Sequence, residues 1–97
     1  MNPFDLFKNM ETLQNQMKSM QGKLDNLRAT GSSGAGMVEV TVNGKMEIIS
    51  LSISKEIVDP NDIKTLEVLV AAAFNAAAAE VQELLKQEAL SLSGRQG

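Results

Sequence analysis

Apolar residues recur with heptad spacing along the N-terminal part of the chain. They are separated alternately by four and three residues: Leu6, Met10, Leu13, Met17, Met20, Leu24 and Leu27. This spacing, with apolar residues at positions a and d, is typical of a helix that packs lengthwise on another helix. We therefore predict a helical arm over residues 1–29, with these residues as candidates for helix packing and dimer formation. We also expect this stripe to be shared between the protomer's own last helix and a dimer mate.

A short run of Gly, Ser and Thr follows the predicted arm, from Thr30 to Gly36. Such clusters interrupt regular structure, so residues 30–36 are predicted to be a flexible link between the arm and the next element. No Gly-Lys-Ser/Thr sequence follows, which argues against a nucleotide-binding P-loop.

Residues 37–54 have the alternation of β-strands. Val38–Val42 alternates β-branched and polar residues, and Asn43-Gly44 is a strong hairpin signal because both residues tolerate positive φ. In the return strand the apolar phase shifts by one residue at Ile48-Ile49, which predicts a β-bulge or a break into two short strands. One face of this antiparallel sheet is apolar and needs a cover.

A second long helix is predicted over residues 59–92. Asp59 suits a helix cap and Pro60 the first helical position. The apolar stripe of this helix includes Val70 and Phe74, which are further packing candidates. Ala on several other faces permits close approach by a sheet on one side and a partner subunit on another. Residues 93–97 are predicted to be a flexible tail.

Composition narrows the functional classes. The chain has no Cys and no His, which removes disulfides, thiolate chemistry, zinc and haem ligation and acid–base schemes that use His. Its carboxylates are expected on helix surfaces or at a cap, without a neighbouring nucleophile, so we predict no enzymatic activity, metal or cofactor. Residues 68–79 form too short an apolar stretch to span a bilayer, and the N-terminus does not resemble a signal peptide. We therefore expect a cytoplasmic protein that makes no membrane contact.

The order of helix, Gly-rich link, Asn-Gly hairpin and capped Ala-rich helix covers essentially the whole chain, and three blocks of sequence within it are specific. The first runs from Gly34 to Val40 and continues into Asn43-Gly44; the second is Ile53 followed by the helix start at Asp59; the third is Leu66–Ala77. In this order and spacing they resemble the YbaB/EbfC family of bacterial nucleoid-associated proteins.

The resemblance implies an α+β fold, in which long N- and C-terminal helices flank an antiparallel hairpin or sheet of two or three strands. It further implies a single domain over residues 1–97 and a tight homodimer, whose sheets meet at the centre and whose helices project as arms. The implied function is non-enzymatic binding of duplex DNA in the nucleoid, with weak or no sequence specificity. Effects on chromosome organisation and gene expression would follow, without a small-molecule substrate.

Basic residues of the arms and tail are the candidate DNA contacts: Lys8, Lys18, Lys23, Arg28, Lys86 and Arg95. Each would neutralise a phosphate and release counterions, so binding should weaken as salt rises. The arm also carries amides that can contact sugar, phosphate or base edges: Gln14, Asn15, Gln16, Gln21 and Asn26. The net charge of −3 and the glutamates of the last helix oppose this binding.

An alternative is a protein-interaction or holdase role. A helix–hairpin–helix order with a Met-rich stripe is also similar to prefoldin subunits, whose coiled-coil tips grip non-native polypeptides. The residues concerned are Phe4, Phe7, Met10, Met17 and Met20. The Ala-rich last helix lacks the long heptad seam that prefoldin would need.

Overall fold

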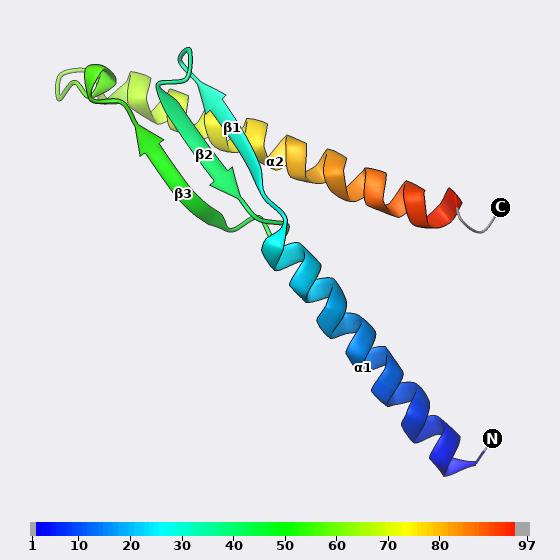
Figure 1. Cartoon of the computed structure of the whole chain (residues 1–97). Helices are drawn as coiled ribbons and strands as arrows, with labels where there is room; N and C mark the ends of the chain where they lie inside the picture. Colours follow the sequence, from blue (N-terminus) through cyan, green and yellow to red (C-terminus); the bar gives the residue numbers. More distant parts are fainter. Residues whose placement is uncertain (1, 95–97) are drawn as a thin grey trace.

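The computed structural model describes residues 2–94, with side chains described up to residue 91. Its elements are α1 (Pro3–Asn26), β1 (Ala29–Ser33), β2 (Val38–Val42), β3 (Ile48–Ile53), a short 3-10 helix η1 (Lys55–Ile57) and α2 (Ile63–Gly94). The strands form one antiparallel sheet in the order β1-β2-β3. Helix α2 lies along one face of this sheet, while α1 projects from its end, in an elongated molecule of 70 × 29 × 16 Å (Figure 1). The predicted α+β class is confirmed.

Strand β1 corrects the prediction of a flexible link. Ala29–Ser33 pairs along its whole length with β2, so the link prediction is wrong for this segment. The turn that follows runs from Gly34 to Met37. Gly34, Ala35 and Gly36 in it have positive φ. Helix α1 ends at Asn26, three residues before the predicted end, because Leu27 is already extended and leads into β1. Glycine in a strand often marks a close backbone approach and not flexibility, and Gly31 has that role here.

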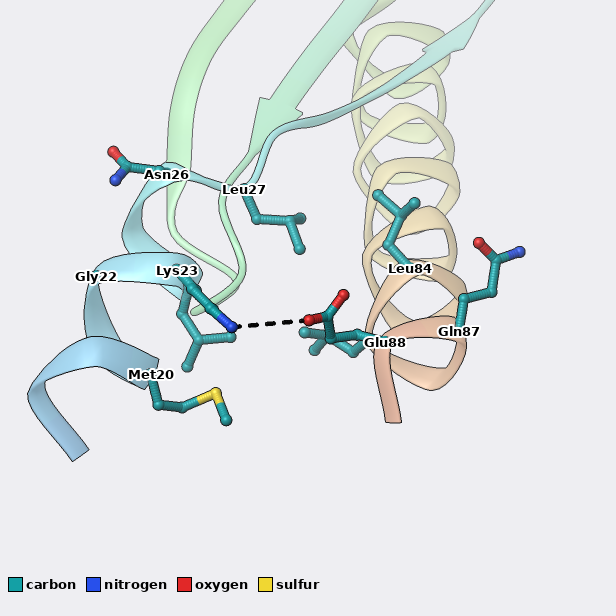
Figure 2. A pocket seen from close by; sticks show the side chains of 10 residues that line it. Met20, Gly22, Lys23, Asn26, Leu27, Leu84, Gln87 and Glu88 are labelled. Carbon is teal, nitrogen blue, oxygen red and sulfur yellow. Dashed lines mark ion pairs between the residues drawn. The ribbon is translucent and has the colours of Figure 1, made fainter. Parts of the chain in front are cut away.

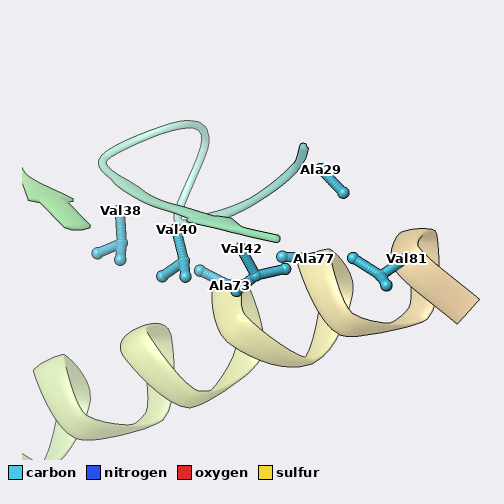
Figure 3. Packing of buried hydrophobic residues seen from close by; sticks show 7 residues of the cluster. All are labelled: Ala29, Val38, Val40, Val42, Ala73, Ala77 and Val81. Atoms are coloured by element: carbon cyan, nitrogen blue, oxygen red, sulfur yellow. The ribbon is translucent and has the colours of Figure 1, made fainter. Parts of the chain in front are cut away.

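The core forms where α2 meets β1 and β2. Its buried side chains are Ala29, Val38, Val40, Val42, Ala73, Ala77 and Val81 (Figure 3). A Cβ at Gly31 would overlap the Ala73 carbonyl oxygen and the Ala77 amide nitrogen, and would lie 2.9 Å from Ala76 Cβ. Strand β1 therefore lies directly against the backbone of α2. The small side chains of Ala on the helix and the missing side chain of Gly31 on the strand permit this short distance. The predicted close approach of the Ala-rich helix to a sheet is confirmed on this side.

The β2–β3 connection is longer than a two-residue turn. Neither Asn43 nor Gly44 has positive φ, whereas Met46 has a φ of 65°. Asn43 is buried, and its side-chain oxygen accepts hydrogen bonds from the Lys45 and Glu47 amides at 2.9 and 3.0 Å. The predicted hairpin is confirmed, but its connection does not use positive φ at Asn43 and Gly44, because the Asn43 side chain organises a wider loop.

The predicted irregularity in β3 is confirmed. Thr41 pairs with Ser50, but Val42 pairs with Ile48, so Ile49 is an extra residue on β3. This is the two-against-one arrangement of a β-bulge.

Helix α2 begins at Ile63, directly after Asp62 and four residues after the predicted cap Asp59. The Asp62 carboxylate accepts hydrogen bonds from the Thr65 amide at 3.3 Å and hydroxyl at 2.7 Å, which places Asp62 at the N-cap. Asp59 accepts instead from the Asn61 amide at 2.9 Å within the preceding turn. The placing of Pro60 at the first helical position is therefore wrong. At its other end α2 continues to Gly94, beyond the predicted Leu92, and residues 95–97 of the predicted tail lie outside the described residues.

By length and composition, the helix segment Ile63–Ser91 is long and apolar enough to cross a membrane. The prediction from sequence concerned only the uncharged residues 68–79, which are too few to span a bilayer. Much of this apolar character comes from Ala, and the face with Ala73, Ala77 and Val81 is packed against the sheet. In this structure the apolar residues of α2 form the helical side of the core.

We predict that Gly31→Ala lowers the free energy of unfolding by about 3 kcal/mol, since the added methyl group meets backbone atoms that have no rotamer to move into. The measurement is urea unfolding followed by helical circular dichroism. Ser32→Ala, at the neighbouring exposed position of the same edge strand, is the control and should change stability by less than about 0.5 kcal/mol. Equal stability of Gly31→Ala and wild type would contradict the close approach of β1 and α2.

The projecting arm as the candidate functional site

Helix α1 extends from the molecule with its apolar stripe uncovered. Between Pro3 and Asn26 no side chain is buried. The exposed fractions along the stripe are 52% for Leu6, 61% for Met10, 58% for Leu13, 57% for Met17 and 49% for Met20. The expectation that α2 shares this stripe is therefore wrong for its outer part, because the two helices diverge from their junction (Figure 1). Leu24 and Leu27, at the base of the arm, are half-buried.

The base of the arm is held by the β2–β3 loop. The Gly44 amide donates a hydrogen bond to the Leu24 carbonyl at 2.8 Å, and a Cβ at Gly44 would lie 2.8 Å from that oxygen and 2.9 Å from Leu24 Cα. Lys45 Nζ lies 2.8 Å from Asp25 Oδ1, and this hydrogen bond raises the pKa of Lys45. No pattern in the sequence indicated this anchor. Glycine is required at position 44 because a Cβ there would be too close to Leu24, and not because of its φ. The Asn-Gly signal does not distinguish these two reasons.

A groove lies between the arm base and the outer part of α2. Its volume is about 780 Å³, and its apolar lining comes from Met20, Leu24 and Leu27 on one side and Leu84 and Leu85 on the other (Figure 2). An ion pair crosses it, from Lys23 Nζ to Glu88 Oε1 at 3.8 Å. Both side chains are more than half exposed, so this pair contributes little stability.

The six residues predicted to contact DNA differ in where they lie and in which groups they contact. Lys8 and Lys18 lie on the exposed arm, and the Lys8 ammonium lies 5.2 Å from the centroid of the Phe4 ring. Lys23 faces Glu88, and the Arg28 guanidinium donates to the backbone carbonyls of Asp25 and Leu27 at 2.5 and 3.0 Å.

One predicted contact lies away from the arm, and another is not described. Lys86 is exposed on α2, and Arg95 lies outside the described residues. The packing candidates Val70 and Phe74 lie against the core cluster and so pack on the sheet instead of on α1.

Charge on the arm is balanced. Residues 3–26 hold three lysines, Lys8, Lys18 and Lys23, and three carboxylates, Asp5, Glu11 and Asp25, so their net charge is 3 − 3 = 0. Within residues 2–94 the acidic side chains form no cluster that could hold a metal ion. The arm therefore offers a few separate cations among amides and apolar side chains, instead of a concentrated positive patch.

Strand β3 provides a second uncovered apolar surface. It is an edge strand, and its side chains Ile48, Ile49 and Leu51 are 56%, 47% and 49% exposed. Leu51 pairs with the buried Val40 and so shares the face of the sheet that carries the core. Helix α2 packs on β1 and β2, and β3 lies at the far side of the sheet from β1 (Figure 1). Its row of apolar side chains is therefore left exposed in the described part of the chain.

Comparison with known proteins identifies relatives over the whole fold. The model of the YbaB/EbfC DNA-binding family matches residues 1–96. A nucleoid-associated protein of Paramagnetospirillum magneticum is 40% identical over 94 residues, which cover 90% of this chain and 88% of that protein. A nucleoid-associated protein of Caldanaerobacter subterraneus is 37% identical over 90 residues, which cover 93% and 81%. The crystal structure of an uncharacterized Helicobacter pylori protein superposes with a TM-score of 0.72 at 24% identity, covering 95% of this chain and 97% of that one, and so shares the fold.

We predict that Gly44→Ala loosens the arm base, because the new methyl group would displace the Leu24 carbonyl that the Gly44 amide binds. The free energy of unfolding should fall by about 1–3 kcal/mol, and amide hydrogen exchange at Leu27 and residue 44 should accelerate. Gly22→Ala, which adds a methyl group in open space on the same helix, is the control and should stabilise α1 by up to about 1 kcal/mol. Unchanged exchange in Gly44→Ala would show that the loop does not hold the arm.

Proposed function

Because the chain belongs to the YbaB/EbfC DNA-binding family, we propose that it is a nucleoid-associated protein that binds duplex DNA as a homodimer. The observation that carries this proposal is the family match over residues 1–96, on a fold whose arm extends into solvent. The place of action would be the nucleoid in the cytoplasm, with effects on chromosome organisation and gene expression. No cofactor, membrane contact or small-molecule substrate enters the proposal.

The exposed arm is the proposed DNA contact. Lys8 and Lys18 occupy its outer face, away from the apolar stripe, where both can reach phosphates. Amides such as Gln14 and Asn15 lie between these lysines and can bind sugar or phosphate oxygens. With so few cations, affinity should be modest and strongly dependent on salt, and phosphate contacts carry no sequence information. Weak or absent sequence preference is the expected result.

The proposed homodimer has support in the edge strand β3. This strand has an unpaired hydrogen-bonding edge and a half-exposed apolar row that continues the core face of the sheet. A second copy that pairs edge to edge would satisfy the backbone groups and cover Ile48 and Leu51. A chain of 97 residues also has a small core of its own, which makes burial against a partner valuable. Dimerisation would double the lysines available to one duplex.

We predict that Lys8→Gln/Lys18→Gln weakens DNA binding similarly on all sequences and flattens its salt dependence. A dimer would lose up to four phosphate contacts, so the slope of log K against log salt should become shallower by up to about 4. The measurement is fluorescence anisotropy with unrelated duplexes across a salt series.

The matched control is Lys55→Gln/Lys64→Gln, which removes the same charge from exposed positions near the opposite end of the molecule from the arm tip (Figure 1). It should keep most of the wild-type slope. If both double variants lost the same slope, the arm would not be the contact. If the wild-type protein bound no duplex in dilute buffer, the DNA-binding proposal itself would fail.

A holdase role is a second candidate, favoured by the apolar tip of the arm. Phe4 and Phe7 are 67% and 74% exposed and are two of the three aromatic residues in the chain. We predict for this role that the protein suppresses aggregation of a thermally unfolded model client, and that a variant lacking residues 1–10 does not. Light scattering measures both. Equal suppression by the truncated chain would exclude the tip as the client site.

A further inference from the structure

The Asn43-Gly44 pair in the β2–β3 loop has a chemical reactivity that DNA binding does not use. Asparagine is among the thermolabile residues of proteins. Its side-chain amide is lost when the backbone nitrogen of the next residue attacks the side-chain carbonyl carbon. Glycine favours this attack because it has no Cβ to obstruct the approach. Asn43 is the only asparagine of the chain that precedes a glycine.

In the folded protein hydrogen bonds hold both reacting groups away from this reaction. The Asn43 side-chain oxygen accepts from the Lys45 and Glu47 amides at 2.9 and 3.0 Å, and its Nδ2 donates to Glu47 Oε1 at 2.9 Å. The nucleophile is the Gly44 nitrogen, whose N–H donates to the Leu24 carbonyl at 2.8 Å. This nitrogen must lose its proton and turn toward Asn43 Cγ, and it cannot do so while it keeps that bond. Asn43 is also only 3% exposed, so little water reaches it.

The acceptor that holds the nucleophile belongs to the arm. Leu24 lies near the end of α1, and a Cβ at Gly44 would lie only 2.9 Å from its Cα and Cδ2 atoms. The ion pair between Asp25 and Lys45 joins the same two elements. When the arm base separates from the loop, the Gly44 amide loses its acceptor and the loop loses its cover. Release of the arm therefore also exposes the reactive pair.

We propose that Asn43 is a site of spontaneous covalent modification, controlled by the attachment of the arm. In the released state the Gly44 nitrogen gives up its proton to solvent and bonds to Asn43 Cγ, and the side-chain nitrogen leaves as ammonia, which closes a succinimide ring. Water then adds to a ring carbonyl and opens the ring to aspartate or isoaspartate at position 43. The sum is amide and water giving carboxylate and ammonium, without oxidant or reductant. The proposal goes beyond DNA binding and does not depend on it.

The products do not fit the closed loop, so the modification acts in one direction. A carboxylate at position 43 has no hydrogen to donate to Glu47 Oε1, and two carboxylates at that distance repel each other. Isoaspartate also lengthens the main chain by a methylene group, next to the Gly44 amide that binds the arm. Either product leaves a charge in a buried place without its partner, which weakens the attachment that had protected Asn43. A molecule that has reacted once keeps a looser arm.

The first test compares the rate of deamidation at Asn43 in the native protein and in the same chain unfolded in guanidinium chloride. The full-length protein is incubated in mildly alkaline buffer, and peptide mapping by mass spectrometry, with synthetic standards for aspartate and isoaspartate, follows the products. The native protein should react at least about tenfold more slowly, because the reaction requires a local opening. Equal rates would overturn the proposal.

Leu24→Ala tests whether the arm gives the protection, since it shortens the side chain over Gly44 and leaves the backbone acceptor in place. Deamidation and amide exchange at Gly44 should both accelerate by about tenfold, because both need the same opening. Leu6→Ala, the same change near the exposed arm tip, is the matched control and should react like wild type. Asp25→Ala removes only the exposed ion pair and should accelerate deamidation by a factor of about two to five. If neither Leu24→Ala nor Asp25→Ala reacted faster than Leu6→Ala, the arm would not control the site.

Asn43→Asp tests the consequence of the modification. In freshly purified protein this variant should accelerate amide exchange at Gly44 by about tenfold, because a buried hydrogen bond is replaced by repulsion. Asn43→Asp/Glu47→Gln should regain most of the wild-type protection, since a glutamine amide can donate to the new carboxylate. Unchanged exchange in Asn43→Asp would overturn the proposed one-way release. None of these results bears on DNA binding, which the lysine variants report separately.

Discussion

The contact between Gly31 and the backbone of α2 sets the distance at which helix and sheet pack, and most of the fold depends on that distance. At this separation Val38, Val40 and Val42 reach α2 directly, and Ala73 and Ala77 are large enough to fill the space between them. Larger side chains on either surface would lift α2 from the sheet. A core of small aliphatic residues is therefore a consequence of this contact, and it makes a thin, two-layer domain with no aromatic residue at its buried centre.

A thin domain leaves two surfaces for other molecules. Helix α2 covers β1 and β2 but is too narrow to cover β3, so the apolar row of Ile48, Ile49 and Leu51 lies open beside the core. The arm is attached through its last turn, by the Gly44 amide and the Lys45–Asp25 ion pair. The domain thus leaves the β3 edge of the sheet and helix α1 exposed to solvent. A second chain can pair with such an edge or pack on such a helix.

The sequence predicted those features that depend on periodicity. The heptad stripe indicated α1, the alternation of Val38–Val42 indicated β2, and the phase shift at Ile48-Ile49 located the bulge. It failed where one residue type serves two purposes. Gly31 looked like part of a flexible link but permits a close approach, and Gly44 looked like a turn residue with positive φ but permits a close approach to Leu24 at the arm base. Of the site, sequence located the basic residues but could not show that Lys23 and Arg28 make contacts within the protomer, because those contacts depend on how the chain folds.

The isolation of α1 from the core also affects how this protein can change over generations. A substitution in the core alters folding and is exposed to selection in every copy of the protein. A substitution between Leu6 and Met20 leaves the sheet and α2 intact, so its effect is felt through whatever the arm touches. Arms of related proteins can therefore diverge in charge and in partner while the domain that carries them stays the same. In such a molecule, thermal stability and biological fitness need not follow one another.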